Sequence, residues 1–337
     1  MLDQSPRHIP VLLNEVIASL KIQQNGTYLD GTFGAGGYTQ AILDTEPNVK
    51  VIALDRDPDA IANGYGLVAA SNGNLTLIEA EFDKLDAEAL TLGITQLDGI
   101  VLDIGVSSMQ IDEAERGFSF RNDGPLDMRM AQSGTSAADI INEAEEAHLA
   151  NIFYYYGEER LSRRVAKAIV AARTEAKITT TKQLSDIIAK VIYAKPNQIH
   201  PSTRVFQALR IAVNDELGQL LRALQAAEHI LKPDGVLSVV TFHSLEDRIV
   251  KQFFKNASGK TEGSRFQPTQ STSAAIFDIK GKWPVSASDA ELNTNPRARS
   301  AKLRAGTRTH APARAPNTDL LELVSLPDHK DTRKGKR

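Results

Sequence analysis

Near its N-terminus the chain reads Thr27-Tyr-Leu-Asp-Gly-Thr-Phe-Gly-Ala-Gly-Gly37. The first four residues have the apolar character of a short buried strand, and the glycines that follow indicate a tight turn leading into a helix. Such a turn lets the backbone approach a ligand closely and directs the N–H groups of a helix N-terminus toward it. The stretch therefore predicts a ligand-binding strand, turn and helix. A purely structural tight turn is the less favoured interpretation.

A second apolar segment, Val51-Ile-Ala-Leu-Asp55, ends in a carboxylate. It follows the glycines at roughly the 20-residue spacing typical of nucleoside sites, where the acidic residue accepts hydrogen bonds from ribose hydroxyls. The dinucleotide fingerprint G-x-G-x-x-G fails, because its third glycine, counted from Gly34, falls on Thr39. The pair of segments therefore predicts a nucleoside cofactor other than NAD. With Asp30 before the glycines, the turn resembles the first motif of S-adenosylmethionine-dependent methyltransferases, in which Asp30 would help hold the cofactor's α-amino group.

Composition excludes several classes of protein. The chain has 337 residues, 42% of them hydrophobic, which is enough for one large or two modest domains. It has no cysteine, so disulfides and cysteine-ligated zinc are excluded, and its seven histidines lack the paired spacing of a metalloprotease. We find no signal-peptide pattern and no apolar run of membrane-spanning length. These features predict a cytoplasmic enzyme without a metal.

Short apolar segments alternate with helical ones, which predicts an α/β fold with a mostly parallel, Rossmann-like sheet. The predicted strands are 27–30, 51–55, 75–79, 98–103 and 236–242, followed by an antiparallel pair at 275–280 and 301–309. Between strands four and five the pattern is helical throughout, ending in one long helix over 203–231. We therefore predict a discontinuous cofactor-binding domain (1–124 and 216–309) and an inserted all-helical substrate-recognition domain (125–215). The remainder, 310–337, is predicted to be a disordered basic tail.

Basic residues are unevenly placed along the chain. The net charge is −3, yet residues 297–337 hold 11 Lys/Arg against 4 Asp/Glu. A second group recurs at helical spacing and is named here the basic stripe: Arg160, Arg163, Arg164 and Lys167. Either feature suits contact with RNA phosphates, and a solvated helix face is the equally weighted alternative for the stripe.

Polar residues with chemical potential follow the predicted fourth and fifth strands. Asp103, with Ser107 shortly after it, and His243 are expected at the carboxyl edge of the sheet, where ligands of doubly wound folds bind. The alternatives are a helix-capping carboxylate for Asp103 and a structural histidine for His243. The loop after the fourth strand carries rings and guanidinium groups suited to an extruded base and its phosphates: Arg116, Phe118, Phe120, Arg121 and Arg129.

Taken together, the motifs resemble the bacterial 16S ribosomal RNA cytosine-N4 methyltransferases, the MraW-like family, over about residues 7–305. They occur in the order His8-Ile-Pro-Val-Leu-Leu13, Asp30-Gly-Thr-Phe-Gly-Ala-Gly-Gly37, Leu54-Asp-Arg-Asp-Pro58, Leu102-Asp-Ile-Gly-Val-Ser-Ser108, Arg116-Gly-Phe-Ser-Phe120, Asp123-Gly-Pro-Leu-Asp-Met-Arg-Met130, Tyr156-Gly-Glu-Glu-Arg160, Phe242-His-Ser-Leu-Glu-Asp-Arg248 and Asn295-Pro-Arg-Ala-Arg-Ser-Ala-Lys-Leu-Arg304.

The resemblance implies a class I methyltransferase fold with an inserted helical domain. It implies methyl transfer from S-adenosylmethionine to N4 of a decoding-centre cytosine, position 1402, in 16S ribosomal RNA within a small ribosomal subunit. It places cofactor contacts at Ala35, Gly36, Gly37, Asp55, Phe82, Asp103 and Gln110. Ala35 and Tyr38 depart from the residues common in relatives, a basic residue and a histidine, respectively.

The catalytic group is left open by the sequence. Asp103, His243 and Ser107 are the candidate acceptors for hydrogen bonds from the cytosine amino group, and Asp103 is also a cofactor contact. The competing functions are methylation of another substrate and a non-catalytic RNA-binding assembly factor. The intact carboxylates and glycines disfavour the assembly factor. Monomer and homodimer are both compatible with the sequence.

Overall fold

The computed structural model describes residues 10–193, 200–259, 274–315 and 320–327. These residues form two compact units: residues 1–105 with 217–323, and residues 106–216 with 324–337. The divisions fall near the predicted domain borders at 125 and 215, although the structure assigns the loop after the fourth strand to the second unit. The assignment of cofactor binding to one unit and substrate recognition to the other stays a prediction.

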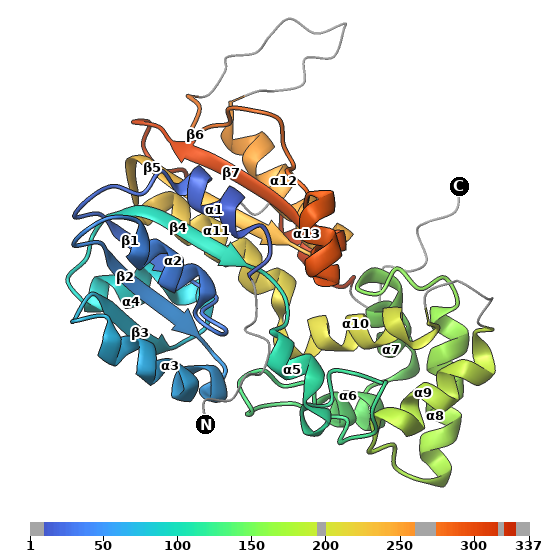
Figure 1. Ribbon diagram of the computed structural model, residues 1–337. Helices are drawn as coiled ribbons and strands as arrows, with labels where there is room; N and C mark the ends of the chain where they lie inside the picture. Colours follow the sequence, from blue (N-terminus) through green and yellow to red (C-terminus); the bar gives the residue numbers. More distant parts are fainter. Residues whose placement is uncertain (1–9, 194–199, 260–273, 316–319, 328–337) are drawn as a thin grey trace, which may run out of the picture. The chain divides into compact units, whose positions relative to one another are not determined.

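The first unit is built on a seven-stranded sheet of order β3-β2-β1-β4-β5-β7-β6 (Figure 1). Strands β1 to β5 are parallel, and β7 runs antiparallel to both β5 and β6. The strands are β1 (Thr27–Asp30), β2 (Lys50–Asp55), β3 (Leu75–Glu79), β4 (Leu97–Asp103), β5 (Leu231–Thr241), β6 (Phe277–Asp278) and β7 (Lys302–Arg308). The α/β fold with a mostly parallel sheet is thereby confirmed, together with the antiparallel pair at the C-terminal end.

Helices cover the sheet because both of its faces are apolar. The helices of this unit are α1 (Leu13–Leu20), α2 (Gly37–Thr45), α3 (Pro58–Ala70), α4 (Leu85–Thr91), α11 (Glu216–Ile230, whose first residue belongs to the other unit), α12 (Ser244–Ala257) and α13 (Asp289–Thr294), with short 3₁₀ turns η1 (Phe82–Lys84) and η3 (Pro296–Ser300). One core cluster joins α1 and α2 to alternate strand residues such as Val51 and Val101. Their neighbours Ile52 and Leu102 are also buried, as expected for parallel strands covered on both sides.

The second unit is helical. It contains α5 (Ser108–Asp112), η2 (Ala114–Arg116), α6 (Ala137–Glu143), α7 (Glu146–Tyr155), α8 (Ser162–Glu175), α9 (Thr181–Val191), α10 (Ser202–Asn214) and α14 (Leu321–Val324), of which the last straddles the division of the chain. Its core includes Phe153, Ile169 and Leu209, all fully buried. Within the described part of this unit the only β pairing is an isolated bridge between Pro125 and Thr180.

Three local predictions need correction. The single helix predicted over 203–231 is two helices, because Asp215 takes a left-handed backbone conformation (φ +47°) that ends α10 before α11 begins. Strand β5 starts at Leu231 rather than 236, since Leu231 pairs with Leu97 ahead of a register shift.

The third correction concerns the tail. Arg314 forms an ion pair with Glu228 at 2.6 Å, and Leu320 is 4% exposed, so the described residues after 310 pack on the fold. Residues 316–319 and 328–337 lie outside the described part. No helix among the described residues is long and apolar enough to cross a membrane.

Candidate cofactor and active site

The glycine-rich turn between β1 and α2 has a backbone that side chains would disturb. Gly34 and Gly36 adopt positive φ angles of +53° and +78°. A Cβ atom on Gly36 would lie 2.9 Å from the Phe33 ring, and one on Gly37 would lie 2.1 Å from Pro10 Cγ. Ala35, the position that departs from the family pattern, sits between the two left-handed glycines. The turn is thus packed closely against Phe33 and Pro10 at Gly36 and Gly37, while Gly34 has only Thr32 O within 4 Å of a Cβ position.

Hydrogen bonds fasten this turn to both neighbouring strands. Gly31 donates its N–H to Val101 O of β4 at 3.0 Å, and Phe33 donates to Leu54 O of β2 at 2.8 Å. The Thr32 hydroxyl accepts the N–H of Asp103 at 2.7 Å. The carboxyl ends of β1, β2 and β4 are therefore held in one place, which brings Asp30, Asp55 and Asp103 to a single edge of the sheet.

Asp55 ends β2, where the sequence predicts a ribose acceptor. Its Oδ2 accepts the N–H of Gly34 at 2.7 Å, and its Oδ1 accepts the N–H of Asp57 at 2.8 Å. An ionised carboxylate has about four acceptor sites, so two remain for ligand hydroxyls. Burial raises the pKa of Asp55 above its ordinary value, against the lowering effect of these two hydrogen bonds.

Asp30 is fully buried beneath the turn. Its Oδ2 accepts a hydrogen bond from the Thr39 hydroxyl at 2.7 Å, and its Oδ1 accepts the N–H of Thr32 at 3.1 Å. Burial raises its pKa to about 6, and the charge of Asp55 contributes in the same direction. Asp30 therefore stabilises the turn and the start of α2 through these two hydrogen bonds, and it also adds negative charge to the site.

Asp103 at the end of β4 is the least compensated of the three carboxylates. Its Oδ1 is buried and has no hydrogen-bond partner among the described residues. Burial holds its pKa well above the ordinary range, with further contributions from the charges of Asp30 and Glu246. The charge of Asp55 raises the pKa of Asp30, and that of Asp30 raises the pKa of Asp103, so the concentration of carboxylates favours a cationic ligand.

Phe82, a predicted cofactor contact, lies in η1 beside the turn. Its Cβ would be 3.4 Å from a Cβ atom placed on Gly31. The residues on either side of Phe82 tie η1 to α11: Glu81 accepts from Gln219 at 2.8 Å, and Asp83 accepts from Arg222 at 2.6 Å. These contacts fix the position of the ring at the same edge of the sheet.

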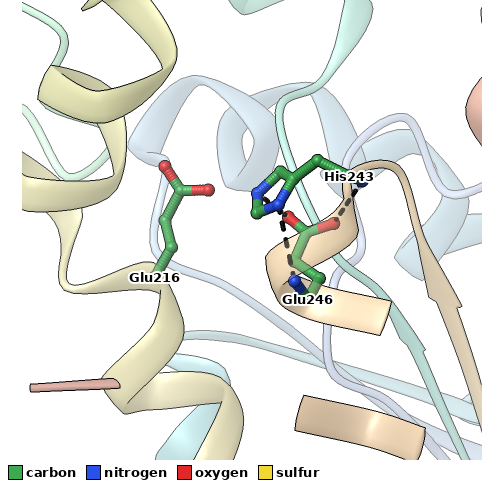
Figure 2. A group of neighbouring side chains, drawn as sticks. All are labelled: Glu216, His243 and Glu246. Carbon is green, nitrogen blue, oxygen red and sulfur yellow. Dashed lines mark hydrogen bonds and ion pairs between the residues drawn. The ribbon is translucent and has the colours of Figure 1, made fainter. Parts of the chain in front are cut away.

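His243 caps α12 at the end of β5 (Figure 2). Its Nδ1 accepts the N–H of Glu246, and its Nε2 lies 2.8 Å from Glu246 Oε1. Glu246 is fully buried and its Oε2 accepts the N–H groups of Phe242 and His243, at 2.7 and 3.1 Å. Nδ1 is thus taken up by the helix cap, which favours the structural interpretation of His243, whereas Nε2 lies close to Glu246 Oε1 without a hydrogen bond among the described residues. Glu216, also drawn in Figure 2, is paired with Arg210 of its own unit.

Ser107 and Gln110 belong to the second unit, where they form a capping box at α5. Gln110 donates its N–H to the Ser107 hydroxyl at 3.2 Å, and its side chain accepts the N–H of Ser107 at 3.0 Å. Their polar groups therefore stabilise the helix start. The roles of Gln110 in cofactor binding and of Ser107 as an acceptor stay predictions.

The candidate RNA residues of the loop after β4 hold that loop together. Arg116 donates to the carbonyls of Arg129 and Met130, at 3.2 and 3.0 Å. Arg129 makes a two-point contact with Asp127 at 2.9 and 2.6 Å.

The aromatic candidates of this loop pack onto the helical unit. Phe120 stacks on His200 with ring centroids 4.4 Å apart, and both Phe118 and Phe120 pack against the core of the unit. Direct contact of RNA with the loop's four candidate side chains stays a prediction; these are Arg116, Phe118, Phe120 and Arg129. Arg121 of the same loop is exposed.

The basic stripe is exposed at all four of its positions, with Arg160 just before α8 and the other three residues on that helix. The opposite face of α8 is buried through Val165, Ala166 and Ile169. The helix thus presents its cations to solvent, as both the phosphate-contacting and the solvated-face interpretations require.

The sequence did not single out several residues that build the site. Thr32 and Thr39 bind Asp103 and Asp30 respectively, and Glu246 binds the chain around His243. Asn214 holds the loop after β4, because its side-chain amide donates to Met128 O and its Oδ1 accepts the N–H of Met130. The partners of Thr32 and Asn214 lie 71 to 86 residues away, so the sequence alone does not pair them, whereas Thr39 and Glu246 bind residues 9 and 3 positions away.

The described residues fit a nucleoside cofactor with a positive charge. The turn is open at Gly34, where a Cβ atom would meet only Thr32 O, at 3.9 Å. Asp55 retains acceptor sites, and the buried Oδ1 of Asp103 lacks a partner among the described residues. A sheet of this order, with a glycine-rich turn and a carboxylate at the ends of its first two strands, is the framework of class I S-adenosylmethionine-dependent methyltransferases.

The chain belongs to the MraW methylase family, whose sequence profile matches residues 5–309. It is 58% identical over 326 residues to the ribosomal RNA small subunit methyltransferase H of Methylobacterium nodulans, covering 96% of each chain. It is 59% identical to the protein of the same name from Methylocella silvestris, covering 95% of this chain and 93% of that one.

Among solved structures, the chain is similar to an rRNA methylase from Streptococcus thermophilus. The TM-score is 0.39 at 9% identity, covering 88% of this chain and 94% of that one. It is also similar to a SAM-dependent methyltransferase from Aquifex aeolicus, with a TM-score of 0.38 at 9% identity, covering 89% and 90%.

Proposed function

We propose that this protein transfers the methyl group of S-adenosylmethionine to N4 of the decoding-centre cytosine at position 1402 of 16S ribosomal RNA. The observation that carries the proposal is the match, over 96% of both chains, to a protein named ribosomal RNA small subunit methyltransferase H. The three carboxylates at the carboxyl edge of the sheet support the choice of cofactor. The substrate is the small-subunit RNA, so the protein is expected to act in the cytoplasm, as a monomer or a homodimer.

When bound, the cofactor supplies an electrophilic methyl group on a positively charged sulfur. Gly34, Gly36 and Gly37 would hold it through the backbone, and Asp55 would accept its ribose hydroxyls. Phe82 would cover its base. In this arrangement the protein chiefly orients the reactants, which is a large contribution to rate for a transfer that needs a linear approach.

Asp103 is the residue best suited to assist the nucleophile. The lone pair of the cytosine amino nitrogen is delocalised into the ring, so a hydrogen-bond acceptor helps it to rehybridise during attack. Asp103 ends β4 at the cofactor edge and has an uncommitted oxygen among the described residues. His243, in contrast, uses Nδ1 as a helix cap. We therefore assign the acceptor role to Asp103 and a structural role to His243.

The test compares RNA from a strain lacking this gene with RNA from the parent, using mass mapping of nucleosides. The deletion should remove N4-methylation of the target cytosine. Re-expression of the wild-type protein, or of a Lys50→Gln control at the amino edge of the sheet, should restore it. Re-expression of a folded Asp103→Ala variant should not. Unchanged methylation in the deletion strain would overturn the proposal.

A further inference from the structure

The run at 295–304 is not used by the site described above, and its local structure exposes Arg297 and Arg299. The side chain of Asn295 accepts the N–H of Arg297 at 3.3 Å and starts η3 together with Pro296. Ala298 and Ala301 are buried at 1% and 2% exposure, and they fix η3 onto the fold. Between these anchors Arg297 and Arg299 are exposed.

The same run continues into β7, where two further basic residues meet α12. Lys302 Nζ lies 3.1 Å from Asp247 Oδ2, and Arg304 Nε lies 2.8 Å from Asp247 Oδ1. These cations lower the pKa of Asp247, against the raising effect of burial, so it stays ionised. One carboxylate therefore joins two basic segments at the first turn of α12.

Helix α12 adds positive charge on its exposed side. Arg248 and Lys251 are exposed, whereas Glu246 is fully buried. On α13, which precedes η3 in the chain, Glu291 Oε1 accepts the N–H of Leu12 at 2.7 Å. We name the group the β7 basic surface; it comprises Arg248, Lys251, Arg297, Arg299, Lys302 and Arg304. Within the group, Lys302 and Arg304 share Asp247, and the Arg304 side chain is 12% exposed; Glu291 of α13 is the nearest acid in the sequence before the run.

This surface lies at the carboxyl edge of the sheet. Lys302 pairs with Thr241, the last residue of β5, in an antiparallel ladder. Because β7 begins where β5 ends, η3 extends from the same edge that carries Asp30, Asp55 and Asp103. Figure 1 shows α13 at the start of β7, with α12 alongside. The basic residues are therefore on the cofactor side of the first unit.

We propose that the β7 basic surface binds phosphates of the RNA strand next to the nucleotide that is methylated. The inference rests on the proposed function and adds a second RNA contact, in the cofactor-binding unit, to the one predicted at the basic stripe. Phosphate contacts fix the register of a nucleic acid without reading its sequence, and cations placed beside the reactive edge would do this for the target strand. The alternative is a solvated surface that does not contact RNA, in which case removing its charge would leave the affinity for RNA unchanged.

The test uses two double variants that remove the same charge from opposite edges of one sheet. Arg297→Gln/Arg299→Gln alters the proposed surface and leaves the Asp247 contacts in place. The matched control, Lys21→Gln/Lys50→Gln, alters two exposed lysines, one in the turn before β1 and the other at the start of β2. Binding of each protein to small ribosomal subunits from the deletion strain is measured between 0.05 and ~0.3 M salt, alongside calorimetry with S-adenosylmethionine.

Each phosphate contact to a single strand contributes about 0.7 to the slope of log K against log salt. Loss of two contacts should lower the slope by about 1.4 and weaken binding roughly tenfold at ~0.15 M salt. The control should match the wild type, cofactor affinity should be unchanged in both, and Arg297→Lys/Arg299→Lys should restore most of the binding. Equal affinity and slope in the arginine variant and the wild type would overturn the inference while leaving the proposed function intact. A wild-type protein that neither binds nor methylates the subunits would instead overturn the proposed function.

Discussion

Replacing Asp30 by asparagine should stabilise the cofactor-free protein at neutral and alkaline pH. The folded protein raises the pKa of this carboxyl from 3.8 to about 6, chiefly through burial. Since the folded pKa is the higher one, the contribution of Asp30 to stability is fully present below about pH 4 and is lost as the pH rises through 6. Above that range its ionisation costs roughly 3 kcal/mol, at about 1.4 kcal/mol for each pH unit between the two values.

The substitution also removes an acceptor, which reduces the gain. Thr39 and Thr32 donate to the two carboxylate oxygens at 2.7 and 3.1 Å. Asparagine keeps one of these oxygens, so the loss is about 1–2 kcal/mol. We therefore expect Asp30→Asn to be more stable than the wild type by about 1–2 kcal/mol at pH 8, which is roughly 4 °C in Tm for a unit of this size. At pH 4.5 the gain should be absent.

Calorimetric melting between pH 4.5 and 8 without cofactor provides the assay. Asp44→Asn, an exposed aspartate on α2, is the control and should melt like the wild type at every pH. Titration with S-adenosylmethionine should show weaker binding to Asp30→Asn despite its greater stability. An Asp30→Asn protein that melts at or below the wild-type temperature at pH 8 would refute the assignment of an unfavourable buried charge at Asp30.

Three further outcomes follow from the site. Asp103→Asn should lower the single-turnover methylation rate far more than it raises the cofactor Kd; full speed at saturating cofactor would restrict Asp103 to cofactor binding. Arg222→Ala should raise the cofactor Kd by about tenfold, or ~1.4 kcal/mol, by releasing η1 and Phe82, with the rate retained at saturating cofactor. The exposed Lys50→Ala, at the start of β2, is the control, and an equal Kd in both variants contradicts the role. Charge reversal along the basic stripe should weaken RNA binding and flatten its salt dependence, while cofactor affinity stays unchanged. An unaltered salt slope would favour the solvated-face interpretation.

The elements at the carboxyl edge were predictable because they depend on local patterns. Apolar runs ending in Asp30, Asp55 and Asp103 predict strands, and consecutive glycines predict the turn, without knowledge of distant contacts. Asp215 shows the limit of this approach. Its neighbours on both sides have helical periodicity, and nothing in that local pattern indicates the left-handed residue that ends α10.

Side-chain roles were harder to predict than positions. Arg116 and Arg129 have the chemistry of phosphate ligands, yet their guanidinium groups bind backbone carbonyls and Asp127 in their own loop. His243 likewise occupies the predicted strand end but caps a helix there. A residue type and a strand end together do not determine which neighbour takes up the hydrogen bonds, since that depends on how each loop and helix start folds, even where the partner is only 13, 2 or 3 residues away.

The crowding of three carboxylates at one edge also bears on turnover. Methyl transfer converts the positively charged sulfur of the cofactor into a neutral thioether, while Asp30, Asp55 and Asp103 keep their positions. The spent cofactor therefore loses one of its attractions to the site at the moment the reaction is complete, which promotes exchange for a fresh molecule. On this basis we expect the protein to prefer S-adenosylmethionine over S-adenosylhomocysteine, and the preference to shrink as acid neutralises the carboxylates.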